Sequence, residues 1–325
     1  MTVSMGRSTT AGKARTWRRP RLVVTGATAV ALLVTACGDR TGSGGKQASA
    51  TISPLAPLAG RLPQSVREKG VIEVGSDIAY PPMEFKDDSG KTVGIDPDIA
   101  AAMGRQLGVE FRFKNGTFDA LLLGLRSKRY DIVMTAMADT KNRQNGISPK
   151  TGNKVGEGVD FVDYFLAGVS LYTRKGDDQG IRSWADLCGR KVAVQRGTVP
   201  EDLTRQESKK CTDGGKAAIA IESFATDLEA QTRLRSGGVD ASSTGSPVAA
   251  YTVKTAGGGN HFQLVGKQVA AAPYGIAVAK DNTQLRDAIK AAVDAIIKNG
   301  AYGKIISKWD VPDGAVTEAR INGGR

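Results

Sequence analysis

Between residues 63 and 312, short apolar runs alternate with segments in which apolar residues recur every three to four positions. Val71-Ile-Glu-Val74 and Lys191-Val-Ala-Val194 predict buried strands, and the spacing over 285–297 predicts a helix that ends before Gly300. Strands that alternate with helices indicate an α/β fold with mainly parallel sheets, because parallel strands need a crossover segment between them. About 250 residues are enough for one large domain or two lobes.

The same pattern predicts individual element boundaries. Gly94-Ile-Asp-Pro-Asp98 predicts a helix start, with Asp96 as the N-cap and Pro97 in the first turn, and Gly108 ends that helix. Two further strands are expected at 109–113 and 131–134, and a further helix at 118–125.

The N-terminus is basic, with no acidic residue before Asp39, and an apolar stretch at 22–36 follows. This order predicts a secretory signal peptide at 1–36. The stretch is shorter than the roughly 20 residues that a membrane-spanning helix needs. Val34-Thr35-Ala36-Cys37 resembles the bacterial lipobox, so Cys37 is expected to carry acyl chains that anchor the protein to the extracellular face of the cell membrane. The alternative is a cleaved signal peptide in which Cys37 is incidental. The sequence does not decide between export by the Sec and the Tat route.

Charge argues against a nucleic-acid partner. Residues 1–36 carry six basic and no acidic residues, so their removal lowers the net charge from +12 to +6 on 289 residues. Without a basic patch rich in aromatic residues, this excess indicates a solvated basic surface.

With Cys37 assigned to lipidation, Cys188 and Cys211 remain. We predict a disulfide between them, because an exported chain meets an oxidising compartment, and its loop closure would stabilise the fold by roughly 3 kcal/mol. Two free buried thiols are the alternative. His261 is the only histidine, so neither a metal site nor a cofactor is expected.

Two segments have the composition of tethers. Residues 37–62 are rich in Gly, Ser, Ala and Pro and predict a flexible linker between the membrane and the folded region. The tail at 313–325 loses its periodicity and is expected to fray.

The order of motifs matches a known family. The segments 72–85 and 94–100 resemble the opening of the family 3 bacterial extracellular solute-binding proteins, which are polar amino acid receptors of ABC importers. The resemblance covers 63–312 and continues, in family order, through the segments 130–137, 139–143, 159–161, 192–198, 272–277 and 300–309.

This resemblance implies a two-lobed fold of the type II periplasmic-binding-protein class, with two mainly parallel sheets flanked by helices. Lobe 1 would hold 63–167 plus 273–312, and lobe 2 would hold 168–272. Two crossover strands near 166–170 and 270–274 would form a hinge, about which the lobes close on a small polar ligand. The implied partners are that ligand and the permease of an ABC importer.

The resemblance also implies a carboxylate-binding end of the cleft. Arg143 matches the arginine that forks onto the ligand carboxylate, a task that suits two parallel N–H donors. The pair Asp139-Thr140 is expected to cap the helix that carries Arg143. Across the cleft, Gly197 and Thr198 are expected to offer backbone N–H groups and a hydroxyl to the same anion.

Other residues are expected to surround the rest of the ligand. Tyr80 and Phe118 match aromatic walls, although core packing is a serious alternative for Phe118. Asp77 matches a position that contacts the ligand ammonium or side chain, whereas Glu84 is expected to be structural. Backbone carbonyls of the ammonium-binding loop are expected from Thr135, Ala136 and Met137.

Two positions depart from the family pattern: Pro97, where an aliphatic residue is usual and a proline in the first helical turn is harmless, and Gly245 in the cleft. Gly245, followed by Ser246, stands where an aspartate is expected to face the ligand ammonium. Asp77 could replace that acid, the ligand could lack a charged amine, or ligand binding could be weakened, since an unpaired buried ammonium is costly.

The leading prediction is therefore a binding protein rather than an enzyme. The alternatives are a cyclohexadienyl-dehydratase-like enzyme, for which Glu84, Asp77 and His261 are the available acids and bases, and a sensor lipoprotein. The Gly- and Lys-containing segment 144–158 predicts an exposed loop, with a cleft lid or a contact with the importer as the less favoured functions.

Overall fold

The computed structural model describes residues 56–324. The predicted signal peptide, Cys37 and positions 38–55 of the predicted linker lie outside the described residues. The last part of that linker belongs to the fold, because Leu62 is fully buried and Leu58 N donates to Gln106 O at 2.9 Å. The folded region therefore begins several residues before position 63.

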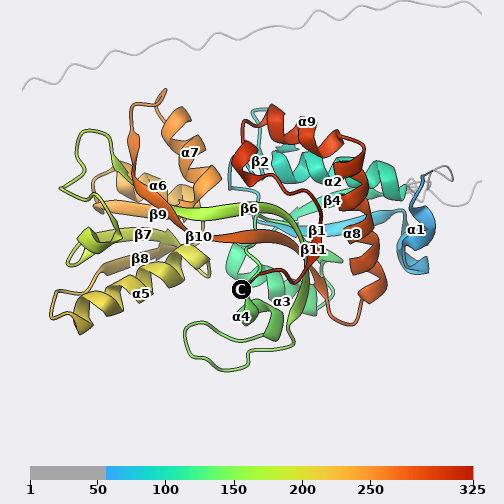
Figure 1. Cartoon of the computed structure of the whole chain (residues 1–325), viewed down its shortest axis with the longest axis horizontal. Coiled ribbons are helices and arrows are strands. Elements are labelled where there is room, and N and C mark those ends of the chain that lie inside the picture. Colours follow the sequence, from blue (N-terminus) through green and yellow to red (C-terminus); the bar gives the residue numbers. More distant parts are fainter. Residues whose placement is uncertain (1–55, 325) are drawn as a thin grey trace, which may run out of the picture. The chain divides into compact units, whose positions relative to one another are not determined.

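A nine-stranded mixed sheet organises the chain, with the order β4-β1-β5-β10-β6-β9-β7-β8 and with β11 paired to β6 (Figure 1). The strands are β1 (Val71–Ser76), β4 (Glu110–Asn115), β5 (Ile132–Val133), β6 (Val159–Arg174), β7 (Lys191–Gln195), β8 (Ala220–Phe224), β9 (Ala241–Gly245), β10 (Phe262–Ala279) and β11 (Arg320–Ile321), beside a separate hairpin of β2 (Phe85–Lys86) and β3 (Thr92–Val93).

Helices cover both ends of this sheet. The α-helices are α1 (Gln64–Lys69), α2 (Ile95–Leu107), α3 (Leu121–Arg126), α4 (Lys141–Asn145), α5 (Val199–Asp213), α6 (Asp227–Arg235), α7 (Ser246–Thr255), α8 (Thr283–Lys298) and α9 (Ala301–Lys308). Short 3-10 helices are η1 (Ala59–Arg61), η2 (Phe118–Ala120), η3 (Trp184–Leu187) and η4 (Pro312–Gly314). Within residues 56–324, no helix is both long enough and apolar enough to cross a membrane.

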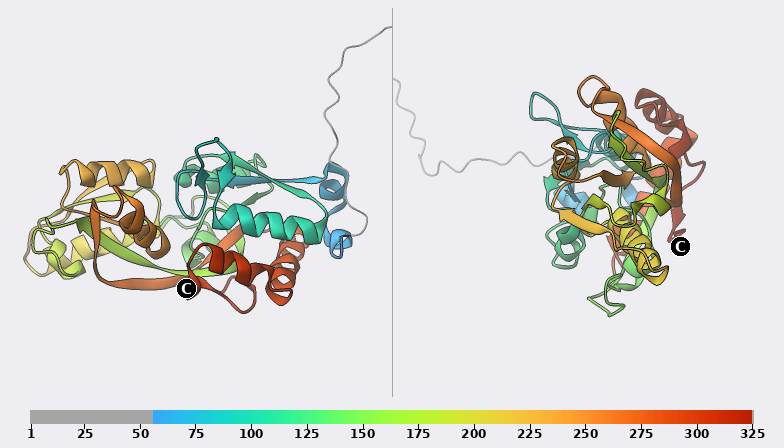
Figure 2. Two further views of the ribbon diagram at one scale, coloured as in Figure 1. Left: turned by 90° about the horizontal axis from the view of Figure 1, so that it is seen from above. Right: turned by 90° about the vertical axis from the view of Figure 1, so that its left-hand side faces the viewer.

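The sheet has two parallel halves joined by two long antiparallel strands. β1 pairs in parallel with β4 and β5, which we call the first half, and β7 pairs in parallel with β8 and β9, which we call the second half. β6 and β10 pair antiparallel from Phe262↔Arg174 to Ala279↔Val159 and run through both (Figure 2). The predicted α/β class is confirmed, but the two expected sheets form one continuous sheet.

Each half has its own hydrophobic core. α2 and α8 pack on the first half, where Ile72, Ile99 and Val293 belong to one fully buried cluster. α5 and α6 pack on the second half, where Leu171 and Val192 lie in a separate cluster. Register shifts in β10 between Val265 and Ala272 interrupt the pairing with β6 at the level between these cores.

The predicted cap at Asp96 is wrong. The helix begins one residue after Gly94, which is the N-cap, and its first turn includes Asp96. The Asp96 carboxylate is turned into the core, where it accepts hydrogen bonds from the Tyr164 hydroxyl at 2.6 Å and from Ala136 N at 3.1 Å. A polar side chain that seemed suited to a helix end instead satisfies buried donors.

The C-terminal tail also differs from expectation, because it is folded up to residue 324. β11 pairs antiparallel with β6, Gly323 N donates to Asp163 Oδ2 at 3.0 Å, and Gly324 N donates to Asp139 Oδ2 at 2.7 Å. The tail thus lies along a strand shared by both halves and reaches the loop that precedes α4.

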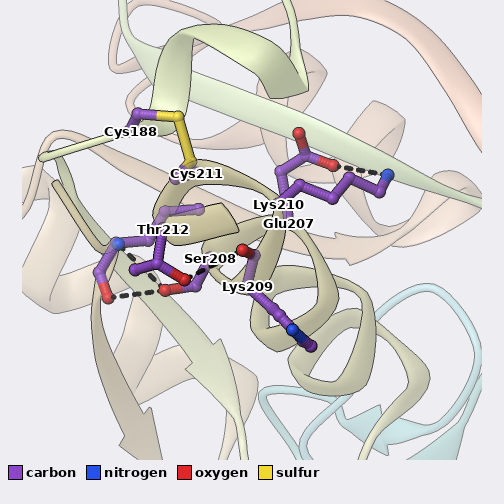
Figure 3. Close-up of a disulfide and its surroundings, with 8 residues drawn as sticks. Cys188, Glu207, Ser208, Lys209, Lys210, Cys211 and Thr212 are labelled. Carbon is purple, nitrogen blue, oxygen red and sulfur yellow. Dashed lines mark hydrogen bonds and ion pairs between the residues drawn. A yellow bond between two sulfur atoms is a disulfide. The ribbon is translucent and has the colours of Figure 1, made fainter. Parts of the chain in front are cut away.

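The predicted disulfide is present. Cys188, just after η3, is bonded to Cys211 near the end of α5, with Cα atoms 5.5 Å apart (Figure 3). On the same helix, the Ser208 hydroxyl accepts a hydrogen bond from Ile219 N at 3.0 Å. These contacts attach the C-terminal end of α5 to the segments that lead into β7 and β8.

Candidate ligand-binding cleft

Segments that follow β1, β5, β7 and β9 meet around a cavity of about 30 Å³. It lies beside the stretches of β6 and β10 that pass between the halves, since Gly168 and Ala270 line it. In open α/β sheets, loops at the carboxyl ends of parallel strands supply ligand sites. The cavity therefore has the position of a binding cleft between the two halves.

Half of the predicted site residues line this cavity: Tyr80, Phe118, Ala136, Arg143, Thr198 and Gly245. The others lie around it. Thr140 and Gly197 line an adjoining groove of about 620 Å³, to which Arg143 also contributes. Asp77, Thr135 and Met137 are buried behind the wall, and Ser246 lines a different cavity.

Arg143 joins the two sides of the cleft. Its Nη1 donates to Ala138 O at 2.6 Å, and its Nη2 donates to Gly197 O at 3.0 Å, while the guanidinium carbon lies 5.3 Å from the centre of the Phe118 ring. Burial lowers the pKa of Arg143 to about 10, so the group stays charged at neutral pH. Thr140 caps α4 as predicted, because its side chain accepts from Arg143 N at 3.3 Å.

The Gly197-Thr198 turn differs from the predicted anion cradle. Gly197 N donates to Glu201 Oε2 at 2.7 Å, so this N–H is already engaged. The Thr198 hydroxyl donates to Gln195 O at 2.6 Å and accepts from Glu201 N as the N-cap of α5. Gly197 is required for its positive φ of 77° and for its approach to Asp119, whose Cβ would lie 3.0 Å from an added Cβ.

Asp77 faces the second half of the sheet. Gln195 Nε2 donates to its Oδ2, and its own backbone N donates to Thr135 Oγ1 at 2.9 Å. Burial raises the pKa of Asp77 to about 6, the Gln195 hydrogen bond opposes this shift, and the negative charges of Asp227, Asp119 and Glu229 add to it. This end of the cleft is therefore electrostatically negative.

Glu84 lies in the core behind the segment that follows β5, which is the predicted ammonium-binding loop. Its Oε1 accepts from the Thr135 hydroxyl at 2.7 Å, and burial together with the neighbouring Asp96 charge raises its pKa well above the ordinary range. Glu84 is fully buried and does not line the cavity. Its contacts hold the segment after β5 in place, which agrees with the predicted structural role.

Tyrosine hydroxyls occupy the space beside Gly245 where an acidic side chain was expected. A Cβ added to Gly245 would lie 2.2 Å from Tyr274 Oη and 2.9 Å from Tyr80 Oη. Tyr80 Oη accepts from Gly245 N at 3.0 Å and lies 2.9 Å from Thr244 Oγ1. Any side chain at position 245 would have to displace this cluster.

The loop at 144–158 reaches across the cleft. Lys150 Nζ lies 3.3 Å from Oε1 of Glu201, a fully buried side chain at the start of α5. A second ion pair between the halves joins Arg196 Nε to Asp119 Oδ2 at 3.3 Å. The loop is therefore more than a surface excursion, because one of its side chains contacts the opposite half.

No catalytic arrangement links the acids and bases named from the sequence. Glu84 is in the core, Asp77 is hydrogen-bonded to Gln195, and the His261 ring packs edge-on against the Phe262 ring with ring centres 6.0 Å apart. Among residues 56–324, no group of three or more His, Cys, Asp or Glu side chains is arranged to hold a metal ion.

Several residues of the cleft were missed from the sequence. Gln195 and Tyr274 line the cavity, and Thr244, Asp119 and Asp227 surround it. One usable signal was position, because Gln195 and Thr244 stand at the carboxyl ends of β7 and β9. Another was Thr198-x-x-Glu201, a capping-box pattern, in which the glutamate side chain accepts a hydrogen bond from a backbone N–H group at the start of the helix.

Comparison with known proteins agrees with this arrangement. The model of the bacterial extracellular solute-binding proteins, family 3, matches residues 72–311. The arginine-binding protein ArgT of Corynebacterium glutamicum is 32% identical over 270 residues, which span 83% of this chain and 84% of ArgT.

Two solved structures are similar in fold and sequence. An ancestral arginine-binding protein bound to arginine has a TM-score of 0.64 and 37% identity, covering 74% of this chain and 98% of that chain. The ancestral amino acid-binding protein AncCDT-1, described as a precursor of cyclohexadienyl dehydratase, has a TM-score of 0.64 and 32% identity, covering 75% and 97%. Because the family model matches residues 72–311, which are most of this chain, the chain belongs to the bacterial extracellular solute-binding proteins of family 3.

Proposed function

We propose that this protein is a lipid-anchored extracellular receptor that delivers a polar amino acid, or a related small carboxylate, to an ABC importer. The observation that carries the proposal is the convergence of Tyr80, Phe118, Arg143 and Thr198 on one cavity between the halves. These groups offer two aromatic surfaces and a guanidinium to the same small molecule, beside the turn that Thr198 caps. Arginine-binding relatives and the family membership support the same role.

The charges of the cleft favour an amino acid with a cationic side chain. Arg143 supplies a positive charge for the carboxylate, while Asp77 lies in the field of Asp119, Asp227 and Glu229. A cation placed near these acids would relieve their mutual repulsion. We therefore propose an arginine-like ligand, with its carboxylate at Arg143 and its side chain directed toward Asp77.

Ligand entry requires the halves to separate. A cavity of about 30 Å³ holds roughly two water molecules, far less than an amino acid needs. We propose that lobe 1 (63–167 plus 273–312) and lobe 2 (168–272) open about 166–170 and 270–274 and then close around the ligand. Breaking the Arg143, Lys150 and Arg196 contacts between the halves would accompany opening.

A ligand screen by thermal unfolding tests the binding role. The soluble chain from residue 38 onward should be screened against the amino acids, small organic acids and osmolytes. A ligand at a hundred times its dissociation constant should stabilise the protein by about 2.7 kcal/mol. We expect the largest rise in melting temperature with L-arginine or another cationic amino acid. A protein that responds to no amino acid or carboxylate would contradict the proposal.

The anchor needs a separate test. Cells expressing the full chain should incorporate an alkyne-labelled fatty acid into the protein, and Cys37→Ser should abolish the label and release the protein from the membrane. Co-purification with an importer permease would support delivery. An unlabelled wild-type protein that is freely secreted would contradict the anchor while leaving the ligand screen unaffected.

A further inference from the structure

The last described segment of the chain, residues 319–324, is held by α8 and β6. Ala319 N donates to Asp294 Oδ1 at 2.8 Å, and β11 then pairs antiparallel with β6. Asn322 N donates to Phe161 O at 3.1 Å, and Asn322 Oδ1 accepts from Phe161 N at 2.9 Å. We call residues 319–324 the strap, because they lie along β6 and lead to the loop before α4 (Figure 1).

Asp139 receives the end of this strap. Its side chain is fully buried, and its Oδ2 accepts from Gly324 N at 2.7 Å. Its other oxygen, Oδ1, accepts from Gln144 Nε2 on α4, also at 2.7 Å. A buried carboxylate is costly when its donors are missing, so Asp139 depends on both hydrogen bonds. One side chain therefore joins the strap to the helix that carries Arg143.

Two consecutive glycines allow the strap to come this close. A Cβ added to Gly324 would lie 2.1 Å from Asp139 O, and a Cβ added to Gly323 would lie 2.6 Å from Asp163 Oδ2. Gly323 N donates to that same Asp163 oxygen at 3.0 Å. A side chain at either glycine would push the strap away from the carboxylate that it binds. The glycine pair is therefore fitted to its two acceptors.

The helix α4 needs support from outside. It has only five residues, Lys141–Asn145, and isolated helices of fewer than about 12 residues are not stable in water. Thr140 caps it by accepting from Arg143 N at 3.3 Å, and Arg143 Nη1 donates to Ala138 O at 2.6 Å. The backbone on both sides of Asp139 therefore sets where the Arg143 guanidinium lies.

We propose that the strap positions Arg143 for the ligand carboxylate and acts through Asp139 and Gln144. Asp139 and Gly324 are positioning residues, since neither lines the cavity. Without the strap, Asp139 Oδ2 loses its donor inside the protein, and the loop before α4 shifts toward another donor. A displaced guanidinium no longer makes two parallel hydrogen bonds to a carboxylate. This inference rests on the proposed function, because it concerns carboxylate recognition at the same site.

A single methyl group tests the proposal. Gly324→Ala blocks the approach to Asp139, whereas a Cβ added to Gly303 on α9 meets nothing within 4 Å, so Gly303→Ala is the matched control. Titration calorimetry should compare L-arginine with L-argininamide, in which a neutral amide replaces the carboxylate. We expect Gly324→Ala to lose about tenfold in the preference for L-arginine, while its affinity for L-argininamide stays within about twofold of wild type. Gly303→Ala should bind both as the wild type does.

Two further variants separate positioning from general stability. A chain that ends at residue 322 lacks both glycine N–H donors and should show the same selective loss. In an Asp139→Ala background, Gly324→Ala should change the preference by less than about twofold, because the carboxylate that the strap binds is gone. An equal loss of affinity for both ligands in Gly324→Ala would assign the strap a general stabilising role and overturn the proposal. A preference kept by Gly324→Ala and by the shortened chain would also overturn it.

Hydrogen exchange tests the link to α4 without a ligand. In the ligand-free protein, exchange of the amides of residues 143–147 should accelerate about fivefold or more in Gly324→Ala and stay at the wild-type rate in Gly303→Ala. Unchanged exchange in Gly324→Ala would overturn the proposal. If exchange accelerates but the wild type does not bind L-arginine, the proposed function fails while the action of the strap on α4 is supported.

Discussion

The two ends of the cleft handle charge in opposite ways. At the Arg143 end, a charged group itself lines the cavity and holds backbone carbonyls of Ala138 and Gly197. At the Gly245 end, hydroxyls line the cavity and the nearest carboxylates are buried behind it. The comparison teaches that the two ends expose their charges differently, because the guanidinium lies in the lining itself whereas the acidic side chains lie behind a lining of neutral oxygens.

The largest effect is expected at the Arg143 end. Arg143→Ala should weaken binding of L-arginine, and of 5-guanidinopentanoate (arginine without its α-amino group), by roughly a hundredfold, because two charge-assisted hydrogen bonds to the carboxylate are lost. Arg143→Lys keeps the charge without the fork and should recover only part of the affinity. Titration calorimetry measures both. Equal binding by Arg143→Ala and wild type would remove the carboxylate assignment and with it the contrast between the ends.

An intermediate effect is expected at Asp77. Since its pKa is raised to about 6 in the folded protein, ionisation costs stability as pH rises from about 4 through 6. Asp77→Asn should therefore raise the free energy of unfolding by about 3 kcal/mol at pH 7.5, with a gain below about 1 kcal/mol near pH 4. The same variant should bind L-arginine less tightly.

Wild-type affinity for L-arginine should fall as pH drops below about 6, and this dependence should vanish in Asp77→Asn. Urea unfolding and calorimetry at both pH values provide the measurement. A variant that is destabilised at pH 7.5 would contradict the raised pKa of Asp77, whereas a variant that keeps the wild-type pH dependence of binding would show that Asp77 does not face the ligand cation.

The smallest effect is expected at the loop that crosses the cleft. Lys150→Ala removes an ion pair between the halves in which the lysine is half exposed, so binding should weaken by only about two- to fivefold. Lys154→Ala is the control, since Lys154 pairs with Glu157 on the same loop. Ligand dissociation followed by stopped flow should accelerate only in Lys150→Ala. Identical rates of ligand dissociation in both variants would show that the Lys150–Glu201 ion pair does not help to keep the cleft closed.

Local patterns in the sequence predicted what depends on neighbours along the chain. Helix and strand periodicity indicated the α/β class, a cap was predicted at Asp139-Thr140 and lies at Thr140, and the pairing of Cys188 with Cys211 followed from composition and compartment. These features depend on a few adjacent residues or on a small number of possible partners.

Contacts between distant segments could not be predicted in this way. Gln195 and Asp77 are 118 positions apart, and Tyr80 and Thr244 are 164 apart. Nothing in the neighbouring sequence of Asp227 indicates that its carboxylate is buried beneath the cleft. The Gly197 turn itself was predicted, but the availability of its N–H group was not, because Glu201 accepts the hydrogen bond from Gly197 N in the fold.

The folded C-terminal tail has a practical consequence for anyone who handles this protein. Gly324 donates to Asp139, whose other carboxylate oxygen accepts from Gln144 on the short helix that carries Arg143. A purification tag or reporter domain fused after residue 325 lies close to these hydrogen bonds. We expect such a fusion to shift the helix that carries Arg143 and to change the measured ligand affinity. Fusions are better joined ahead of residue 56, where the chain enters the fold away from the ligand.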